Sequence, residues 1–344
     1  MRLLQLMAGA AEGGAENFFK RLAIALQSSA IEQRLVIRTE PAREKKIRDA
    51  GIELATARFG GRLDFVTSRI LKREIGLFRP DVVLTWMNRA TAFCPRAGSG
   101  GDFRHVGTPR GYYDPKYYRR CDHLVVTTDD LSRFYTGHGW SPDRLSVIPN
   151  FAPFEPLPSI SRDDLDTPAD APVLLALGRL HRNKGFDTLL AALAYLPDHF
   201  LWIGGVGPLE NELRAQARKL DVADRVRFLG WREDVAALLA AADVFVCSSR
   251  HEPFGNIVIE AWMYGVPIVA AASEGPSSLI EDGVTGLLVP VDDGSAMAKA
   301  VARLAGEPNL ATGLAAAGLR QYEGHYTEEI ILPKYLNLFE RLTG

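Results

Sequence analysis

Short apolar runs alternate along the chain with longer segments of helical periodicity, and this alternation constrains the fold more than any other feature. Short apolar runs separated by helical segments are typical of βα units on parallel sheets. In the first part of the chain, the predicted strands are Leu3–Met7, Arg34–Ile37, Val82–Thr85 and Leu124–Thr127. The helices predicted between them include Glu16–Gln27, Arg62–Phe78 and Asp130–His138.

A second series of the same kind follows residues 153–172, a Pro- and Asp-rich stretch whose composition predicts a linker that includes Pro156. The predicted strands of this series are Val173–Leu177, Leu201–Ile203, Val226–Leu229, Val244–Cys247, Ile268–Ala271 and Gly286–Val289. Its predicted helices include Phe186–Tyr195, Leu209–Leu220, Val235–Ala241 and Ser295–Ala305, and Glu328–Leu342 after a break at Glu323-Gly324.

The length of 344 residues is enough for two hydrophobic cores. We therefore predict an α/β protein of two doubly wound, Rossmann-like domains, each built on a parallel sheet. Ligands are expected at the carboxyl ends of the strands, in a cleft between the domains.

Composition and cysteine content indicate a cytoplasmic protein. Hydrophobic residues make up 47% of the chain, and no apolar run reaches the roughly 18–20 residues of a membrane span. The apolar start of the chain is too short for a secretory leader and is predicted to be a strand. Cys94, Cys121 and Cys247 are odd in number and have no motif spacing, which indicates reduced thiols.

The two halves of the chain differ in charge. Residues 1–150 contain 24 Lys and Arg against 16 Asp and Glu, whereas the remainder contains 16 against 26. A basic half beside an acidic half suggests that the first one meets an anionic partner. The alternative is a chance distribution of solvated side chains.

The strongest chemical signal lies at residues 251–265, where seven residues separate Glu252 from Glu260. Pro253 and Gly255 mark a helix start, so Glu252 is expected on a loop at the helix mouth and Glu260 about two turns down the helix. Backbone N–H groups near Asn256 then suit a phosphate or hydroxyls, and the carboxylates suit sugar hydroxyls. The alternative is a half-buried helix with two solvated acids.

Two further loops of the second half follow predicted strands. The first contains Gly178, Arg179 and Lys184, and its two cations are suited to neutralise a diphosphate, although loop cations are also commonly solvated. The second contains Gly205, where glycine permits close approach of a ligand to the backbone. Trp231 follows the next strand and is expected either to border a nucleotide base or to pack in the core.

Several other site classes lack their motifs. Gly9 and Gly14 have P-loop separation, but Ala15 and Glu16 replace the required Lys-Ser/Thr. The Asp-x-Asp at 164–166 falls in the predicted linker, and no His or Cys spacing matches zinc. The sequence therefore predicts neither a metal site nor a cofactor.

Together and in this order, five motifs resemble the retaining nucleotide-sugar glycosyltransferases of family 4, which have the GT-B fold. They are GGAE at 13–16, GRLHRNKG at 178–185, GGVGP at 204–208, SSRHEPFGNIVIEA at 248–261 and EDGVTGLLVPVDD at 281–293. The resemblance implies that the last helix crosses back to the first domain. The expected domains are then 1–152 with 328–344 for the acceptor and 173–327 for the donor, joined by 153–172.

The resemblance also implies roles for residues. Glu252, Arg179 and Lys184 would be the catalytic residues. Arg179 and Lys184 would bind the donor diphosphate beside Gly178 and Gly205, and Glu252 would hold the transferred sugar. The remaining donor-binding candidates are Gly13, Gly14, Phe254, Gly255, Asn256, Ile257, Glu260 for the ribose, and Trp231 for the base. The family reaction needs no metal and uses a nucleoside diphosphate sugar, with UDP favoured and GDP as the alternative.

This chain departs from the family pattern in its first domain. Many relatives carry a His near the transferred sugar on the loop after the fifth strand, but the corresponding stretch here is residues 108–114, and His105 lies inside the preceding strand. Arg110, Tyr112 and Asp114 are the candidates to replace that His near the acceptor.

The acceptor is predicted to be a lipopolysaccharide core or another bacterial surface glycan or glycolipid. Residues 110–120 interleave aromatic and cationic side chains, and the predicted helix from Arg62 carries Arg69, Lys72 and Arg73, which suits the inner face of the cytoplasmic membrane. A soluble acceptor is the alternative, and no nucleic-acid module is present. Two rival functions remain: a non-catalytic nucleotide- or glycan-binding subunit, and a nucleotide-sugar epimerase of the same fold.

Overall fold

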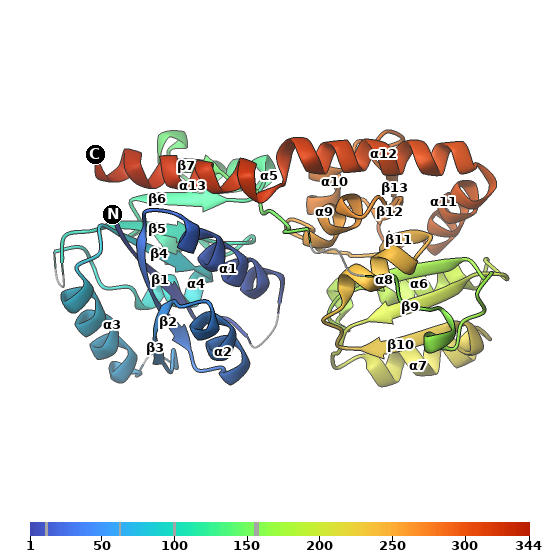
Figure 1. The fold of residues 1–344 in the computed structure, drawn as a ribbon, viewed down its shortest axis with the longest axis horizontal. Coiled ribbons are helices and arrows are strands. Elements are labelled where there is room, and N and C mark those ends of the chain that lie inside the picture. Colours follow the sequence, from blue (N-terminus) through green and yellow to red (C-terminus); the bar gives the residue numbers. More distant parts are fainter. Residues whose placement is uncertain (11–12, 62, 99–100, 155–157) are drawn as a thin grey trace. The chain divides into compact units, whose positions relative to one another are not determined.

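The computed structural model describes residues 1–10, 13–61, 63–98, 101–154 and 158–344. The chain divides into two compact units, Met1–Phe151 with Glu328–Gly344 and Ala152–Thr327 (Figure 1). Arg62 and Pro156, which the sequence analysis names, lie outside the described residues.

The first unit is built on a parallel sheet in the order β3-β2-β1-β4-β5-β6-β7. Its strands are β1 (Arg2–Met7), β2 (Glu32–Arg38), β3 (Glu53–Ala57), β4 (Val82–Trp86), β5 (Arg104–Thr108), β6 (His123–Val126) and β7 (Leu145–Val147). Because the strands are parallel, helices cover both faces. These helices are α1 (Gly14–Ala25), α2 (Pro41–Asp49), α3 (Phe65–Phe78), α4 (Met87–Phe93), α5 (Asp129–Gly137) and α13 (Glu328–Thr343).

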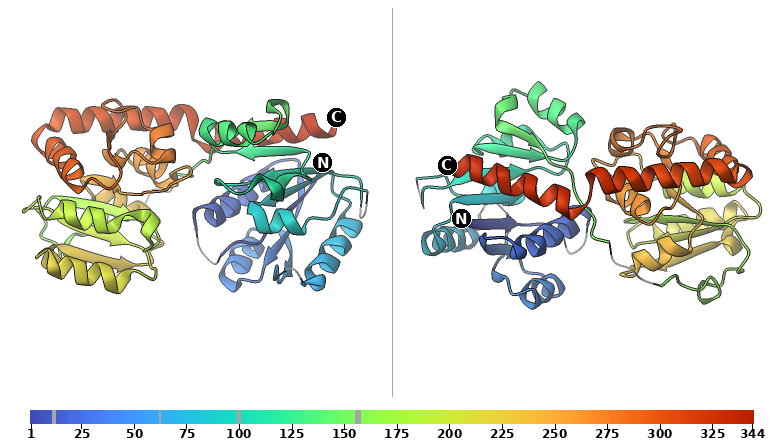
Figure 2. Two further views of the ribbon diagram at one scale, coloured as in Figure 1. Left: turned by 180° about the vertical axis from the view of Figure 1, so that it is seen from behind. Right: turned by 45° about the horizontal axis from the view of Figure 1, so that its top comes forward.

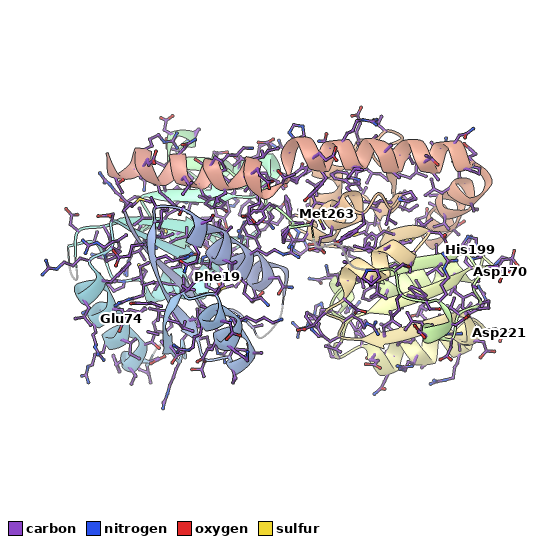
Figure 3. All side chains as sticks on the ribbon, in the orientation of Figure 1. Phe19, Glu74, Asp170, His199, Asp221 and Met263 are labelled. Atoms are coloured by element: carbon purple, nitrogen blue, oxygen red, sulfur yellow. The ribbon has the colours of Figure 1, made fainter. Side chains whose placement is uncertain are left out.

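Apolar cores form on both faces of this sheet. Helices α1, α2 and α13 bury their side chains in one core, so the last helix of the chain packs on the first unit (Figure 2). Phe19 of α1, labelled in Figure 3, meets the ring of Trp86 edge to face, with the ring centroids 5.3 Å apart. Helices α3 and α4 pack against the opposite face.

The second unit has a parallel sheet in the order β10-β9-β8-β11-β12-β13. Its strands are β8 (Val173–Leu177), β9 (Phe200–Gly204), β10 (Val226–Gly230), β11 (Val244–Cys247), β12 (Ile268–Ala271) and β13 (Leu287–Val289). The helices are α6 (Phe186–Leu193), α7 (Glu210–Lys219), α8 (Val235–Ala241), α9 (Asn256–Met263), α10 (Glu274–Leu279), α11 (Gly294–Gly306) and α12 (Pro308–His325).

The order of strands determines where a ligand can bind in the second unit. Helices α6, α7 and α11 pack on one face of the sheet, and α8 and α9 pack on the other. The chain changes direction across the sheet between β8 and β11, which are neighbours. The loops after these two strands therefore separate at a topological switch point, where doubly wound folds bind their ligands. The two predicted Rossmann-like domains, each built on a parallel sheet, are present.

The stretch that was expected to be a linker is partly packed against the second unit. Arg162 bonds the Asp243 carboxylate and the carbonyl oxygen of Ala241, and Thr167 accepts a hydrogen bond of 2.9 Å from Trp202. The described residues of this stretch are grouped with the second unit.

The predicted helix break at Glu323-Gly324 is wrong. Helix α12 continues to His325, and the chain leaves the helix at Tyr326, whose ring lies 6.1 Å from that of Trp262. A glycine inside a helix costs only about 1 kcal/mol, which the buried contacts of Tyr322 and Tyr326 outweigh.

The three cysteines are free and buried. Burial raises the pKa of Cys94 and Cys121 well above the ordinary thiol value, so both stay protonated at neutral pH. Among the helices in the described ranges, none combines the length and the apolar composition that are needed to cross a bilayer.

Candidate active site

The loop after β8 contains Gly178, Arg179 and Lys184 and closes with the single 3₁₀ turn Arg182–Lys184. The backbone of Gly178 has φ of +152°, and a Cβ there would come within 3.1 Å of Cε of Lys184. Glycine at this position therefore lets the stem of Lys184 lie over the loop. Arg179 is exposed and forms no ion pair with any residue that the structure describes.

The loop after β11 approaches the loop after β8 through several backbone contacts. The N–H of Arg250 donates to Asn183 O at 2.8 Å, and Ser248 Oγ donates to Lys184 O at 2.8 Å. Gly185 packs so closely on Ser248 that a Cβ would overlap the Ser248 carbonyl oxygen. These contacts fix the distance between the two strand ends.

Lys184 and Glu252, 68 positions apart in sequence, meet as an ion pair between these two loops. Their side chains are 24% and 15% exposed, so the pair is shielded but still reaches solvent. Burial opposes the charge of Lys184, but the carboxylate of Glu252 outweighs this effect and raises the pKa of the ammonium above its ordinary value. Two of the predicted catalytic residues are thus in direct contact.

Helix α9 begins directly after the Glu252 loop. Its N-cap is Gly255, whose φ of +93° is in the left-handed region, and it has no side chain to cap the first turn. Asn256 and Ile257 form the start of the helix and are partly exposed. The side chain of Phe254 is buried and its ring packs on that of Tyr326, so the ring is not exposed to a ligand.

Glu260 is half-buried on α9, four residues after the first residue of the helix. Glu260 was expected two turns down the helix, which is wrong by about one turn because the helix starts at Asn256 and not at Pro253. Its Cα lies about 6 Å along the helix axis from that of Asn256.

Glycines bring the next two loops together at the same sheet edge. Gly205 has φ of +139°, and a Cβ there would overlap the Gly178 carbonyl oxygen. The N–H of Gly205 donates to Gly230 O at 2.6 Å, and the N–H of Gly178 donates to Gly204 O at 2.9 Å. Trp231 follows Gly230 and is half-exposed, which leaves ring surface available beside the loops.

Glu274, at the start of α10, is a residue that the sequence analysis missed. Its carboxylate accepts from the N–H of Glu252 at 3.2 Å and lies 2.7 Å from Nδ1 of His251. Burial opposes the charge of Glu274, but its hydrogen bonds outweigh this effect and lower its pKa. The sequence could have indicated this residue, because Glu274 follows the predicted strand Ile268–Ala271 and therefore lies at the carboxyl end of a strand in a parallel sheet.

Arg250 is the second residue that was missed. Its guanidinium makes a bidentate pair with Asp187, at 2.7 and 2.6 Å, and also contacts Asp292 and the Arg182 carbonyl oxygen. The hydrogen bond from Arg250 lowers the pKa of Asp187. This cluster links the loops that follow β8, β11 and β13.

Gly13 and Gly14 are the N-cap and the first residue of α1 in the first unit. A Cβ on Gly13 would overlap Oε2 of Glu16, whose buried carboxylate accepts from the N–H of Ala10 at 2.8 Å. Glycine at 13 therefore leaves room for the Glu16 carboxylate inside this loop.

The three acceptor-binding candidates of the first unit have partners within that unit. Arg110, with φ of +66°, lies between the rings of Phe18 and Trp86, 4.4 and 4.5 Å from their centroids. Tyr112 donates to Asp130, and Asp114 pairs with Lys116 at 2.6 Å. Their role toward an acceptor stays a prediction.

His105 lies in β5, as the sequence analysis states, and is buried. Burial lowers its pKa to about 4, and its Nε2 lies 3.0 Å from Thr85 Oγ1. It therefore fills a core position and does not reach the loop after the strand. Across residues 1–10, 13–61, 63–98, 101–154 and 158–344, no three His, Cys, Asp or Glu side chains gather as a metal site.

Two family models match the two units of the chain. The model of "Glycosyltransferase Family 4" matches residues 12–155, and the model of "Glycosyl transferases group 1" matches residues 171–307.

Proteins of known name and structure match most of the chain. LpsE of Rhizobium meliloti, a lipopolysaccharide core biosynthesis glycosyltransferase, is 35% identical over 335 residues, which is 95% of this chain and 96% of LpsE. LpsD of the same organism, which has the same description, is 35% identical over 338 residues, 96% of each chain. The structure of Anabaena HepE with UDP and glucose has a TM-score of 0.88 at 20% identity, covering 99% of this chain and 100% of HepE. The chain therefore belongs to the glycosyltransferase family that these two models describe, and it has the GT-B fold.

Proposed function

We propose that this glycosyltransferase moves a hexose from a nucleoside diphosphate sugar to a lipopolysaccharide core or a related bacterial surface glycan or glycolipid, with retention of configuration and without a metal ion. The names of LpsE and LpsD, which match nearly the whole chain, support the class of acceptor. UDP is the favoured nucleotide, in line with the complex of HepE, which has the same fold.

The observation that carries this proposal is the pairing of Lys184 with Glu252 at the switch point of the second sheet. A cation and a carboxylate that are shielded but accessible can each take a ligand group: the ammonium takes a phosphate oxygen, and the carboxylate takes sugar hydroxyls. Exposed Arg179 adds a guanidinium on the same loop, and the N-terminus of α9 adds backbone N–H groups.

These groups act mainly on the leaving diphosphate. The bond from the anomeric carbon to the diphosphate oxygen breaks, and its electron pair stays on that oxygen, where Lys184 and Arg179 stabilise the charge. The acceptor oxygen forms the new bond on the same face, and its proton passes to a phosphate oxygen. Beside Glu252 the pKa of the Lys184 ammonium is raised above its ordinary value, so the group is available as a cation for the phosphate.

A panel of nucleotides tests the donor half of the proposal. Thermal shifts are measured with UDP, GDP, ADP, CMP and TDP, each with and without EDTA, because a ligand at 100 times its Kd adds about 2.7 kcal/mol. Stabilisation by UDP that EDTA does not change is the expected result. Stabilisation that EDTA abolishes would contradict the metal-free reaction.

Incubation with a UDP-hexose and a lipopolysaccharide core acceptor then tests the chemistry. Transfer with retention supports the proposal. Conversion of the donor sugar into its epimer without any acceptor would favour the epimerase, and nucleotide binding without turnover on any acceptor would favour a binding subunit.

A further inference from the structure

Large apolar side chains are exposed to water where β3 leads into α3 in the first unit. Leu63 is 82% exposed, Phe65 is 74% exposed and Val66 is 53% exposed. Leu77, further along α3, is 63% exposed. A contiguous group of exposed apolar side chains marks an interaction surface, whereas single ones do not.

Cations surround this group on the exposed side of α3. Phe65, Arg69, Lys72 and Arg73 follow the spacing of one helical face, and all four are exposed. Arg58 is exposed at the end of β3. The opposite side of the helix is buried through Thr67, Leu71, Ile75 and Phe78.

The acidic groups of this segment are turned to other partners. Asp64 caps α3 by accepting from the N–H of Thr67 at 2.9 Å and from the N–H of Gly60 at 2.7 Å, and hydrogen bonding with Thr67 lowers its pKa to about 2. Glu74, labelled in Figure 3, pairs with Arg34 at 3.3 Å. The exposed face is thus apolar and positively charged.

The stretch at 110–120 exposes Arg119, Arg120 and Tyr117, the last to 37%, but it has fewer exposed apolar side chains than the group at α3. Tyr118 is fully buried, Tyr112 packs edge to face on Phe134, and Lys116 is paired with Asp114. The structure therefore moves the candidate contact with an anionic surface from this stretch to α3.

We propose that Leu63, Phe65 and Val66 insert into the headgroup region of an anionic bilayer while Arg58, Arg69, Lys72 and Arg73 contact its phosphates. We name this set the α3 surface. Apolar side chains flanked by cations complement the apolar boundary and the negative charge of such a membrane, and interfacial helices bury their apolar face by about 5–10 Å. The inference deepens the proposed function and rests on it in one respect: a lipid-carried acceptor would be presented at this surface.

Sedimentation with vesicles tests the binding. The full chain is mixed with vesicles of phosphatidylcholine alone or with phosphatidylglycerol at low salt. We expect binding only to the anionic vesicles, and a loss of about tenfold or more in partitioning for the Leu63→Ser, Phe65→Ser, Val66→Ser triple variant. Tyr195→Ser, at a similarly exposed aromatic residue of the second unit (67%), is the control and should bind as the natural chain does.

Charge is tested separately with Arg69→Gln, Lys72→Gln and Arg73→Gln together. Binding of the natural chain should weaken with salt, because the Debye length falls from about 30 Å at 0.01 M to about 8 Å at 0.15 M. The variant lacks the three cations that salt screens, so it should bind more weakly and lose most of this salt dependence. Lys116→Gln, on the stretch at 110–120, should bind normally.

A fluorescent probe tests which face inserts. The three native cysteines are buried, so Phe65→Cys and Tyr195→Cys each offer one accessible thiol for an environment-sensitive dye. The dye on Phe65→Cys should shift to the blue and brighten with anionic vesicles, whereas the dye on Tyr195→Cys should not change.

Three results would overturn the inference: no binding of the natural chain to anionic vesicles, undiminished binding of the triple serine variant, or a dimer of the natural chain that this variant dissociates. Nucleotide-induced thermal shifts are measured on the same variants. Because the α3 surface lies outside the donor loops, these shifts should stay unchanged, so a failure of membrane binding is separable from a failure of the proposed transferase.

Discussion

A cation follows a strand at the carboxyl edge of the sheet in both units, but the two side chains are held in different ways. Lys184, after β8, pairs with Glu252 and remains partly exposed. Arg110, after β5, lies between Phe18 and Trp86, donates to Asn150 at 2.9 Å, and has buried Nε and Nη2 atoms that reach no acceptor among the described residues. A partly exposed ion pair can exchange its partner for a ligand, whereas a buried, stacked cation must first break its packing.

In the second unit, the charged side chain of Lys184 remains accessible to a ligand, whereas in the first unit the charge of Arg110 is held within the packing. Burial lowers the pKa of Arg110, and Tyr335 of α13 opposes this effect. Arg110 therefore lies where the last helix packs on the first unit, a position that suits a structural role. Four predictions test this contrast, from the largest expected effect to the smallest.

The largest effect is expected from Glu252→Ala. Loss of the carboxylate removes the contact to the transferred sugar, and transfer should fall by about 10²–10³-fold or more while UDP still binds. Turnover with UDP-sugar and UDP-induced thermal shifts measure the two effects. Near-normal turnover would remove Glu252 from the site, and Glu252→Gln separates the loss of charge from the loss of packing.

A smaller effect is expected from Lys184→Ala. A hydrogen bond to a charged group contributes about 1.5–3 kcal/mol, so affinity for UDP should fall by roughly 10–100-fold. Calorimetric titration with UDP and with uridine checks this prediction, because uridine lacks the diphosphate and should bind the variant and the natural chain alike. An unchanged affinity for UDP would contradict the role of Lys184.

In the first unit, Arg110→Ala should reduce stability by about 2 kcal/mol because it removes two ring contacts and leaves a void beside Trp86. The melting temperature of the first unit should fall by roughly 4–8 °C. Affinity for UDP should not change. A normal melting temperature together with a raised KM for the acceptor would instead identify Arg110 as an acceptor-binding residue.

The last prediction concerns the pH dependence of the first unit. Burial lowers the pKa of His105 to about 4, whereas an unfolded His titrates near 6.5. The unfolded chain therefore takes up this proton first, and the stability that neutral His105 provides is complete above about pH 6.5 and is lost as the pH falls toward 4. At pH 5 the loss is about 2 kcal/mol.

Melting curves of the natural chain and of His105→Gln between pH 7 and pH 5 measure this loss. The variant should lose less stability over the same interval, because the substituted side chain does not titrate. Equal losses in both proteins would show that other groups cause the acid sensitivity.

Much of the fold follows from local patterns in the sequence. The strands Val173–Leu177, Val244–Cys247 and Ile268–Ala271 and the helix Val235–Ala241 have the predicted bounds. The strands that escaped prediction are short or only partly buried, such as β3 and β7. Their side chains give no clear apolar run, and pairing with a neighbouring strand stabilises them.

The candidate site could be predicted only in part. Short motifs identify Lys184 and Glu252, but nothing in the spacing of the motifs states that the two side chains touch. Glu274 and Arg250 were missed because their importance depends on loops that come together from β8, β11 and β12.

The sequence by itself determined the two series of βα units and the loops that carry polar chemistry, because periodicity and loop composition are local properties. The tertiary structure decided which charges pair, which aromatic side chains at 110–120 turn inward, and that α12 continues through Gly324. These outcomes depend on packing between residues far apart in the chain, where burial and desolvation outweigh local preference.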